Sequence, residues 1–254
     1  MNRLFITGDT HIPYDISKLN TTNFPIQSDL STEDYVTIAG DCGLIWNYKH
    51  TGYSIPSCPE DECWVKEELY WYDWLNEKPF TTLFVDGNHE NFDRLAKYPI
   101  IDWHGGKVQK ISDSILHLMR GEVYQIGDTT LFTFGGARST DRGPATGSAE
   151  YDQGFSWWKE ELPSMAEMDN ARANLEKVNY NVDIVITHAL PNRVLALLGY
   201  YDFDLTTSFL DDISDRLTFD KWFAGHYHVD RHLMNKYIVQ YNDITEYIKQ
   251  EEII

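Results

Sequence analysis

Aspartate, asparagine and histidine side chains recur directly after short apolar runs of the sequence. Runs of four to six β-branched or aromatic residues bounded by glycine indicate buried strands. Such runs occupy residues 4–7, 35–39, 82–85 and 184–187. Loops that follow strand carboxyl ends are where open α/β sheets place their sites. Seven polar residues stand in such loops, and they are Asp9, His11, Asp41, Asn88, His188, His226 and His228.

These residue types are typical metal ligands. Imidazole suits zinc, iron and nickel, whereas carboxylate suits manganese and magnesium. Two aspartates, one asparagine and four histidines are too many for one ion, but they are enough for two ions that share a bridging carboxylate. Two metals roughly 3.5–4 Å apart clamp a phosphoryl group and lower the pKa of a bound water. The pattern therefore predicts a two-metal centre for phosphoryl chemistry. We expect two divalent ions, manganese first, with iron, zinc or nickel as alternatives.

The elements that must position these residues alternate between strands and helices. Helical patterns occupy residues 60–77, 164–178 and 206–217, and the second begins with a capping box of Ser164 and Glu167. Further strands are expected at 114–119, 123–126, 130–134, 219–223 and 237–241. This alternation predicts an α/β fold with two stacked sheets flanked by helices.

Composition limits the class of protein and its partners. The chain has 254 residues and is 42% hydrophobic and 24% charged, which excludes wholesale disorder. Without a linker or repeat, residues 1–254 are expected to form a single domain. The net charge of −19 disfavours long nucleic acids and anionic membranes. Neither an apolar stretch of 18 residues nor a signal peptide is present, so we expect no membrane partner and a cytoplasmic location. Cys42, Cys58 and Cys63 are interpreted as free thiols.

Five blocks, taken together, resemble the calcineurin-like metallophosphoesterase superfamily. In order they are Gly8-Asp9-Thr10-His11, Gly40-Asp41, Gly87-Asn88-His89-Glu90, Thr187-His188 and Gly225-His226-Tyr227-His228. The resemblance implies a four-layer sandwich of two mixed β-sheets and flanking helices. It also implies that water or hydroxide held by two metals attacks a phosphoester. One metal would be held by Asp9, His11 and His228, the other by Asn88, His188 and His226, and Asp41 would bridge them.

The same resemblance implies catalytic roles for two neighbouring residues. His89 would protonate the leaving oxygen or hold the phosphate, and it would not be a ligand. Glu90 would orient His89, because an imidazole acid needs a partner on its other nitrogen. Glu90 is equally compatible with a second interpretation, in which it is an acidic residue at the start of a helix over 91–98.

The sequence also departs from the superfamily's protein serine/threonine phosphatases. Those enzymes carry arginine beside the second block and just before the third. Here the second block continues with Cys42-Gly43, and Asp86 precedes the third. A phosphodiester or a nucleotide-type small substrate is therefore favoured. The alternatives are a phosphomonoesterase or protein phosphatase, and a non-catalytic scaffold of the same fold.

Two further segments are candidate substrate contacts. An insert at about 44–80 includes the aromatic run 46–50 and is expected to form a substrate wall or lid, although Trp46 could equally pack inside the protein. Arg138 follows a predicted strand in a loop of small residues. It could reach a phosphate oxygen in place of the missing arginines, or simply be a surface residue.

Overall fold

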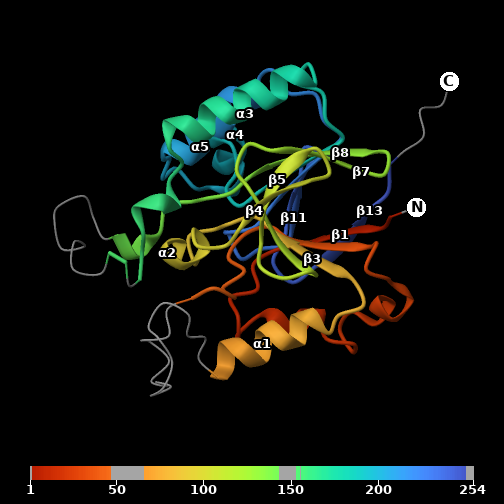
Figure 1. Cartoon of the computed structure of the whole chain (residues 1–254). Helices are drawn as coiled ribbons and strands as arrows, with labels where there is room; N and C mark the ends of the chain where they lie inside the picture. The colour runs from red at the N-terminus through yellow and green to blue at the C-terminus, as the bar shows by residue number, and fades with distance from the viewer. Residues whose placement is uncertain (1, 47–65, 143–152, 155, 250–254) are drawn as a thin grey trace.

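The structure of the chain is a computed structural model that describes residues 2–46, 66–142, 153–154 and 156–249. Two mixed β-sheets pack face to face at its centre (Figure 1). The two-sheet α/β fold predicted from the sequence is therefore confirmed.

The larger sheet has seven strands, and its central strands are parallel. Its order is β13 (Ile244–Tyr247), β1 (Leu4–Thr7), β2 (Tyr35–Ile38), β3 (Thr81–Phe84), β6 (Ile115–Leu118), β5 (Gly106–Lys110) and β4 (Ile100–Trp103). Strand β13 pairs antiparallel with β1, and β4 and β5 form an antiparallel hairpin at the other edge.

The smaller sheet has six strands. Its order is β11 (Arg231–Leu233), β12 (Tyr237–Val239), β10 (Lys221–Ala224), β9 (Ile184–Thr187), β8 (Thr129–Phe134) and β7 (Val123–Ile126). Strands β12, β10, β9 and β8 are parallel, so their carboxyl ends meet at one edge.

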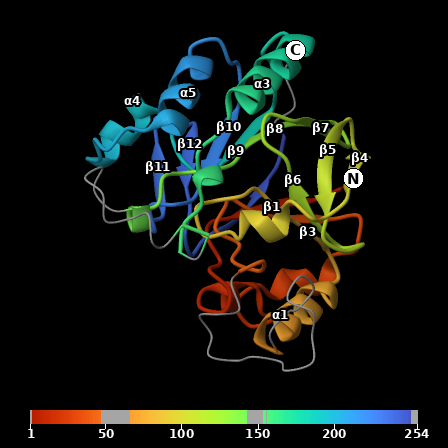
Figure 2. The same cartoon turned by 60° about the vertical axis from the view of Figure 1, so that its left-hand side comes forward.

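Helices cover the outer faces of both sheets. On one side lie α3 (Met165–Lys177), α4 (Asn192–Leu195) and α5 (Leu205–Ser214), and on the other lies α1 (Lys66–Asn76) (Figures 1 and 2). A one-turn helix, α2 (Phe92–Leu95), follows the loop after β3. The described 3₁₀ turns are Ile16–Leu19, Pro25–Asp29, Thr140–Arg142, Lys159–Glu161 and Ala196–Leu198.

The side-chain alternation of the strands builds three apolar layers. In β1, Leu4 and Ile6 pack between the sheets, whereas Phe5 faces the layer under α1. In β9, Ile184 and Ile186 pack between the sheets, whereas Val185 faces α3 and α5. Strands buried on both faces explain why these runs are continuously apolar in the sequence.

Most predicted elements form near their expected positions, with corrections at their ends. Ser164 caps α3 as expected. Helix α5 is capped by Asp204, whose carboxylate accepts the Thr207 N–H, so it begins at Leu205 and ends three residues early, at Ser214. Strand β12 ends at Val239 rather than at residue 241. The expected helical residues 60–65 lie outside the described part of the chain, and α1 begins at Lys66.

The sequence reading missed the hairpin of β4 and β5 and the edge strand β13. Strand β4 is half exposed, which weakens the apolar signal on which strand prediction depends. Among the described helices, none combines the length and apolar character needed to cross a membrane.

Candidate metal centre

The loops that carry the seven predicted ligands converge from both sheets. Asp9 and His11 follow β1, Asp41 follows β2, and Asn88 follows β3, all in the seven-stranded sheet. His188 follows β9, and His226 and His228 follow β10, in the six-stranded sheet. Because these strands are parallel to their neighbours within each sheet, their carboxyl ends deliver the side chains to a common edge.

Asp41 lies at the centre of the cluster. Its Oδ2 is 3.3 Å from His11 Nε2 and 3.3 Å from His188 Nε2. Its Oδ1 accepts the backbone N–H groups of Asn88 and His89, each at 2.7 Å. One carboxylate thus contacts loops that follow three different strands.

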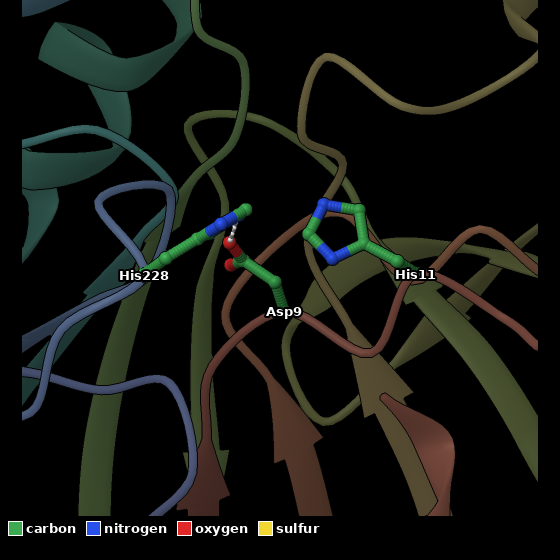
Figure 3. Close-up of side chains that lie close together, drawn as sticks. All are labelled: Asp9, His11 and His228. Atoms are coloured by element: carbon green, nitrogen blue, oxygen red, sulfur yellow. Dashed lines mark ion pairs between the residues drawn. The ribbon is translucent and has the colours of Figure 1, made fainter. Parts of the chain in front are cut away.

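The ligand-type atoms form adjoining groups. Within each group, the atoms lie no more than 4.8 Å apart. The groups are Asp9, His11 and His228; His11, Asp41 and His89; and Asp41, His188 and His226. Figure 3 shows the first of these, with Asp9 between two imidazoles that come from opposite ends of the chain. Asn88 joins the cluster through Oδ1, which lies 3.3 Å from His188 Nε2.

The imidazole of His188 shows how well the cluster suits a cation. Its Nδ1 lies 2.9 Å from the carbonyl of Ala39, which can only accept, so Nδ1 carries a proton. Its Nε2 then faces two acceptors, Asp41 and Asn88, and needs either a proton or a metal ion between them. Burial lowers the pKa of His188, but Asp41 and Asp9 outweigh it and raise the pKa to about 9. A divalent cation would take the place of that proton.

The backbone of these loops is held in an uncommon conformation. His11, Asp41, His226 and His228 have φ of 31°, 46°, 70° and 50°. Residues other than glycine rarely adopt this left-handed region, at a cost of about 1–3 kcal/mol each. Such strain clusters at ligand clamps, where the surrounding structure enforces it.

Two glycines permit close approach of the loops to the carboxylates. A Cβ at Gly87 would lie 2.0 Å from Asp41 Oδ1, and one at Gly225 would lie 2.1 Å from Asp9 Oδ1. Asp9 accepts the backbone N–H of His226 at 2.9 Å in the space that Gly225 leaves. The glycines beside the ligands are therefore needed to bring backbone donors onto the acids.

His89 lies at the edge of the cluster. Its ring centroid is 5.2 Å from that of His11 and 5.5 Å from that of Trp46. Trp46 is fixed in turn by Trp158, whose ring lies 5.7 Å away and whose indole N–H donates to Asp93. His89 is thus supported by an aromatic wall, and its place near Asp41 and His11 is also compatible with metal ligation.

Glu90 is buried and makes its hydrogen bonds to a neighbouring loop. Its Oε1 accepts the backbone N–H groups of Cys42 at 2.8 Å and Gly43 at 3.4 Å. Its Oε2 has no hydrogen-bond partner among the described residues. Burial and the charge of Asp41 raise the pKa of Glu90 well above its ordinary value. The observed contacts therefore hold the loop after Asp41, and the expected orienting of His89 by Glu90 stays a prediction.

A cavity of about 800 Å³ opens beside the cluster. Its lining joins histidines of the cluster to aromatic side chains and two acids. The lining residues are His11, Ile12, Pro13, Tyr14, Asp15, Gly43, Trp46, Glu68, Trp71, His89, His228 and Tyr241. Trp46, Glu68 and Trp71 belong to the predicted insert at 44–80, whose residues 47–65 lie outside the described part of the chain.

Arg138 lies in the loop after β8, which is parallel to β9, the strand that precedes His188. Its guanidinium is 3.9 Å from the carboxylate of the exposed Asp202, and its backbone N–H donates to Asp204. Its role in substrate binding stays a prediction. Asp86, which stands where the superfamily's serine/threonine phosphatases carry arginine, is buried and accepts from Arg120 Nε at 2.9 Å. An arginine is therefore nearby, but it is engaged by Asp86.

Three polar residues that were not predicted from the sequence support the cluster. Asp15 contacts His11, Tyr241 contacts both Asp15 and His228, and Lys18 contacts the backbone of Asp9. Asp15 follows His11 by four positions, a spacing that the sequence does show. Of the cysteines, Cys42 is a buried free thiol, as expected, and the other two lie outside the described residues.

Two comparisons with known proteins bear on the family of the chain. No curated protein matches the chain. The sequence profile described as calcineurin-like phosphoesterase matches residues 3–230, a range that includes all seven predicted ligands. The chain therefore belongs to the calcineurin-like phosphoesterase family, whose activity is metal-dependent hydrolysis of phosphoesters.

Proposed function

We propose that this chain hydrolyses a phosphodiester or a nucleotide-type small substrate at a two-metal centre. One observation carries the proposal: Asp41 lies 3.3 Å from an imidazole of each of two adjoining ligand groups. In this proposal Asp9, His11 and His228 hold one divalent ion, and Asn88, His188 and His226 hold the other. Asp41 bridges the two. Manganese is our first choice, and iron, zinc and nickel also fit these ligands.

The donor set fits such ions on chemical grounds. Imidazole nitrogens face carboxylate oxygens at 3.2 Å for His228 and Asp9 and at 3.3 Å for His11 and Asp41. When bound, two divalent ions would offset charge on the phosphate oxygens and acidify a water. In our proposal the protein's own contribution is to hold the ligands in place and to donate a proton to the leaving oxygen from His89.

The cavity supports a substrate with a flat group. Trp46, Trp71 and Tyr14 line it beside His89. Base–aromatic stacking contributes about 1–3 kcal/mol per base. The described lining includes no arginine or lysine to grip the charge of a phosphomonoester. It does include the acids Asp15 and Glu68, and Glu68 is paired with Arg94. A diester carries less charge than a monoester, so this lining favours a diester.

Hydrolysis of two model substrates tests the proposal. Protein stripped of metal and reconstituted with manganese would be assayed on bis-(p-nitrophenyl) phosphate and p-nitrophenyl phosphate. We expect clear turnover of the diester and two manganese ions per chain. Turnover of the monoester alone would reassign the protein as a phosphomonoesterase, and activity on phosphopeptides but not on diesters would make it a protein phosphatase. Two bound ions without turnover of any of these would favour a non-catalytic scaffold.

A further inference from the structure

The ligand group formed by Asp9, His11 and His228 is supported by three other side chains. Asp15 and Lys18 follow the same strand, β1, whereas Tyr241 follows β12 in the other sheet. Each of them contacts a different ligand, and Tyr241 contacts the other two supporting residues as well. We call Asp15, Lys18 and Tyr241 the supporting triad.

Asp15 determines which nitrogen of His11 can bind a metal. Its Oδ2 lies 2.9 Å from His11 Nδ1. An ionised carboxylate only accepts hydrogen bonds, so Nδ1 must carry the proton. The lone pair of His11 is then on Nε2, the atom that lies 3.3 Å from Asp41. Partners of this kind fix ring orientation and raise the basicity of a ligating histidine.

Tyr241 holds both histidines of the group. Its hydroxyl donates to Asp15 Oδ1 at 3.0 Å, which leaves Oδ2 free for His11. Its ring stacks on that of His228, with centroids 4.6 Å apart and planes 13° apart. The side chain of His228 is half exposed, so this stack limits its freedom on the solvent side. One tyrosine therefore couples two ligands that are distant in sequence.

Lys18 fixes the backbone of the third ligand. Its ammonium donates to the carbonyl of Asp9 at 2.5 Å and to that of Gly8 at 3.3 Å. It also donates to the carbonyl of Tyr241. Lys18 thus connects the loop after β1 to the loop after β12. The backbone of Tyr241 is held from the other side by Asp230, whose Oδ1 accepts its N–H at 2.8 Å.

The ligand group that contains His188 and His226 is held by other contacts than those of the supporting triad. His188 is oriented by the carbonyl of Ala39, and the His226 ring contacts those of His188 and Tyr227. None of the described contacts of the supporting triad reaches His188 or His226. Loss of the triad should therefore affect the two metals unequally.

We propose that Asp15, Lys18 and Tyr241 are positioning residues that set the metal affinity of the Asp9, His11 and His228 group alone. This inference rests on the proposed two-metal centre. Outer partners of metal-ligating histidines typically contribute 10–100-fold to metal affinity, which gives the expected size of the effect as about that range.

Manganese titration of the metal-free 254-residue chain tests the inference. Isothermal calorimetry would compare the wild type with Asp15→Asn, Lys18→Met, Tyr241→Phe and Tyr241→Leu. We expect one of the two ions to bind about 10–100-fold more weakly and the other to be unchanged. The loss of manganese affinity should be larger in Tyr241→Leu than in Tyr241→Phe, because leucine also removes the stack on His228. Matched controls are Tyr201→Phe and Asp102→Asn, since both side chains are highly exposed and lie outside the cluster.

The melting temperature of the metal-free variants separates positioning from folding. A positioning role leaves it within about 4 °C of the wild type, a shift of about 1 kcal/mol for a chain of this size. If Asp15→Asn or Lys18→Met has a melting temperature below this range, the manganese affinity of Tyr241→Phe becomes the test of the inference. That variant removes a single hydroxyl and leaves the rest of the side chain in place. Equal weakening of both ions, or unchanged binding in Tyr241→Leu, would overturn the inference.

Failure of the inference can be told apart from failure of the proposed function. A wild-type chain that binds two ions and hydrolyses the diester, with variants that bind like the wild type, rejects the triad only. A wild-type chain that binds two ions without hydrolysis rejects the proposed activity only. A chain that binds none of manganese, iron, zinc and nickel rejects both.

Discussion

The carboxylate of Asp41 and the imidazole of His188 meet across the two sheets, with Oδ2 and Nε2 3.3 Å apart. Asp41 follows β2 of the seven-stranded sheet, and His188 follows β9 of the six-stranded sheet. Burial would raise the pKa of Asp41, but His188 and His11 hold it well below its ordinary value. The acid therefore stays ionised where the two sheets meet, as the proposed bridging role requires.

Asp41→Asn is expected to abolish tight binding of both ions. The substitution keeps the shape of the side chain but removes the charge that both ligand groups share. Diester hydrolysis should fall by at least ~100-fold, the upper end of what outer partners contribute. Metal analysis after gel filtration would check it, with Asp102→Asn as the control. Retention of two tightly bound ions would contradict the bridging role.

His89→Gln should slow substrates with poor leaving groups more than nitrophenyl esters. General acid catalysis contributes about 10²–10⁴-fold, and a good leaving group has little need of the proton. The measurement is kcat for an alkyl ester against kcat for a nitrophenyl ester, together with manganese content. Equal losses for both esters would remove the role as an acid. Loss of one ion would show instead that His89 is a ligand, which its distance to Asp41 and His11 permits.

Trp46→Ala should weaken binding of substrates with an aromatic group. Trp46 lines the cavity and contacts His89, and a lost stack is worth about 1–3 kcal/mol, or roughly 5–150-fold in KM. KM would be compared for an aromatic diester and a dialkyl diester, with Tyr201→Ala as the exposed aromatic control. An equal change for both substrates would mean that Trp46 acts through packing.

Arg138→Ala should raise KM if the side chain leaves Asp202 to hold a phosphate oxygen. The two groups are 3.9 Å apart at an exposed position, so their ion pair contributes little, about 0–1 kcal/mol, and can exchange for a phosphate. KM would be measured alongside Asp202→Asn, which removes this ion pair and should lower KM. Unaltered KM in Arg138→Ala would make Arg138 a surface residue.

Asp34→Asn should destabilise the metal-free protein at neutral pH and flatten its sensitivity to acid. The carboxylate accepts the backbone N–H groups of Arg3 and Ser31, each at 2.8 Å. Burial raises its pKa, but these hydrogen bonds outweigh burial and lower it. A lowered folded pKa stabilises the protein above the unfolded value of about 3.9. That contribution is lost as the pH falls through the folded pKa.

Urea unfolding of Asp34→Asn and the wild type at pH 7 and under acidic conditions would measure this effect. The expected loss at pH 7 is about 1–3 kcal/mol, as for hydrogen bonds to a charged group. The difference between the two proteins should shrink as the pH approaches the folded pKa. Asp102→Asn is the control, and a difference independent of pH would contradict the argument.

The sequence alone determined the candidate ligands, because their signal is local. A short apolar run, a glycine and a polar residue stand together for Asp9 after β1 and for Asp41 after β2. The start of α3 could likewise be predicted from its capping box, Ser164 and Glu167. Family membership followed from the order of five such blocks and is borne out over residues 3–230.

The tertiary structure alone decided which side chains meet. Tyr241 lies beside His228 and Asp15 only because β12 pairs with β10 and because the two sheets place their carboxyl ends together. Glu90 accepts from the backbone of Cys42 because β2 and β3, the strands that precede these residues, are parallel neighbours in the seven-stranded sheet. Contacts between distant loops depend on sheet order and packing, which composition and periodicity do not encode. The residues that hold the predicted ligands in place could therefore be identified only from the tertiary structure.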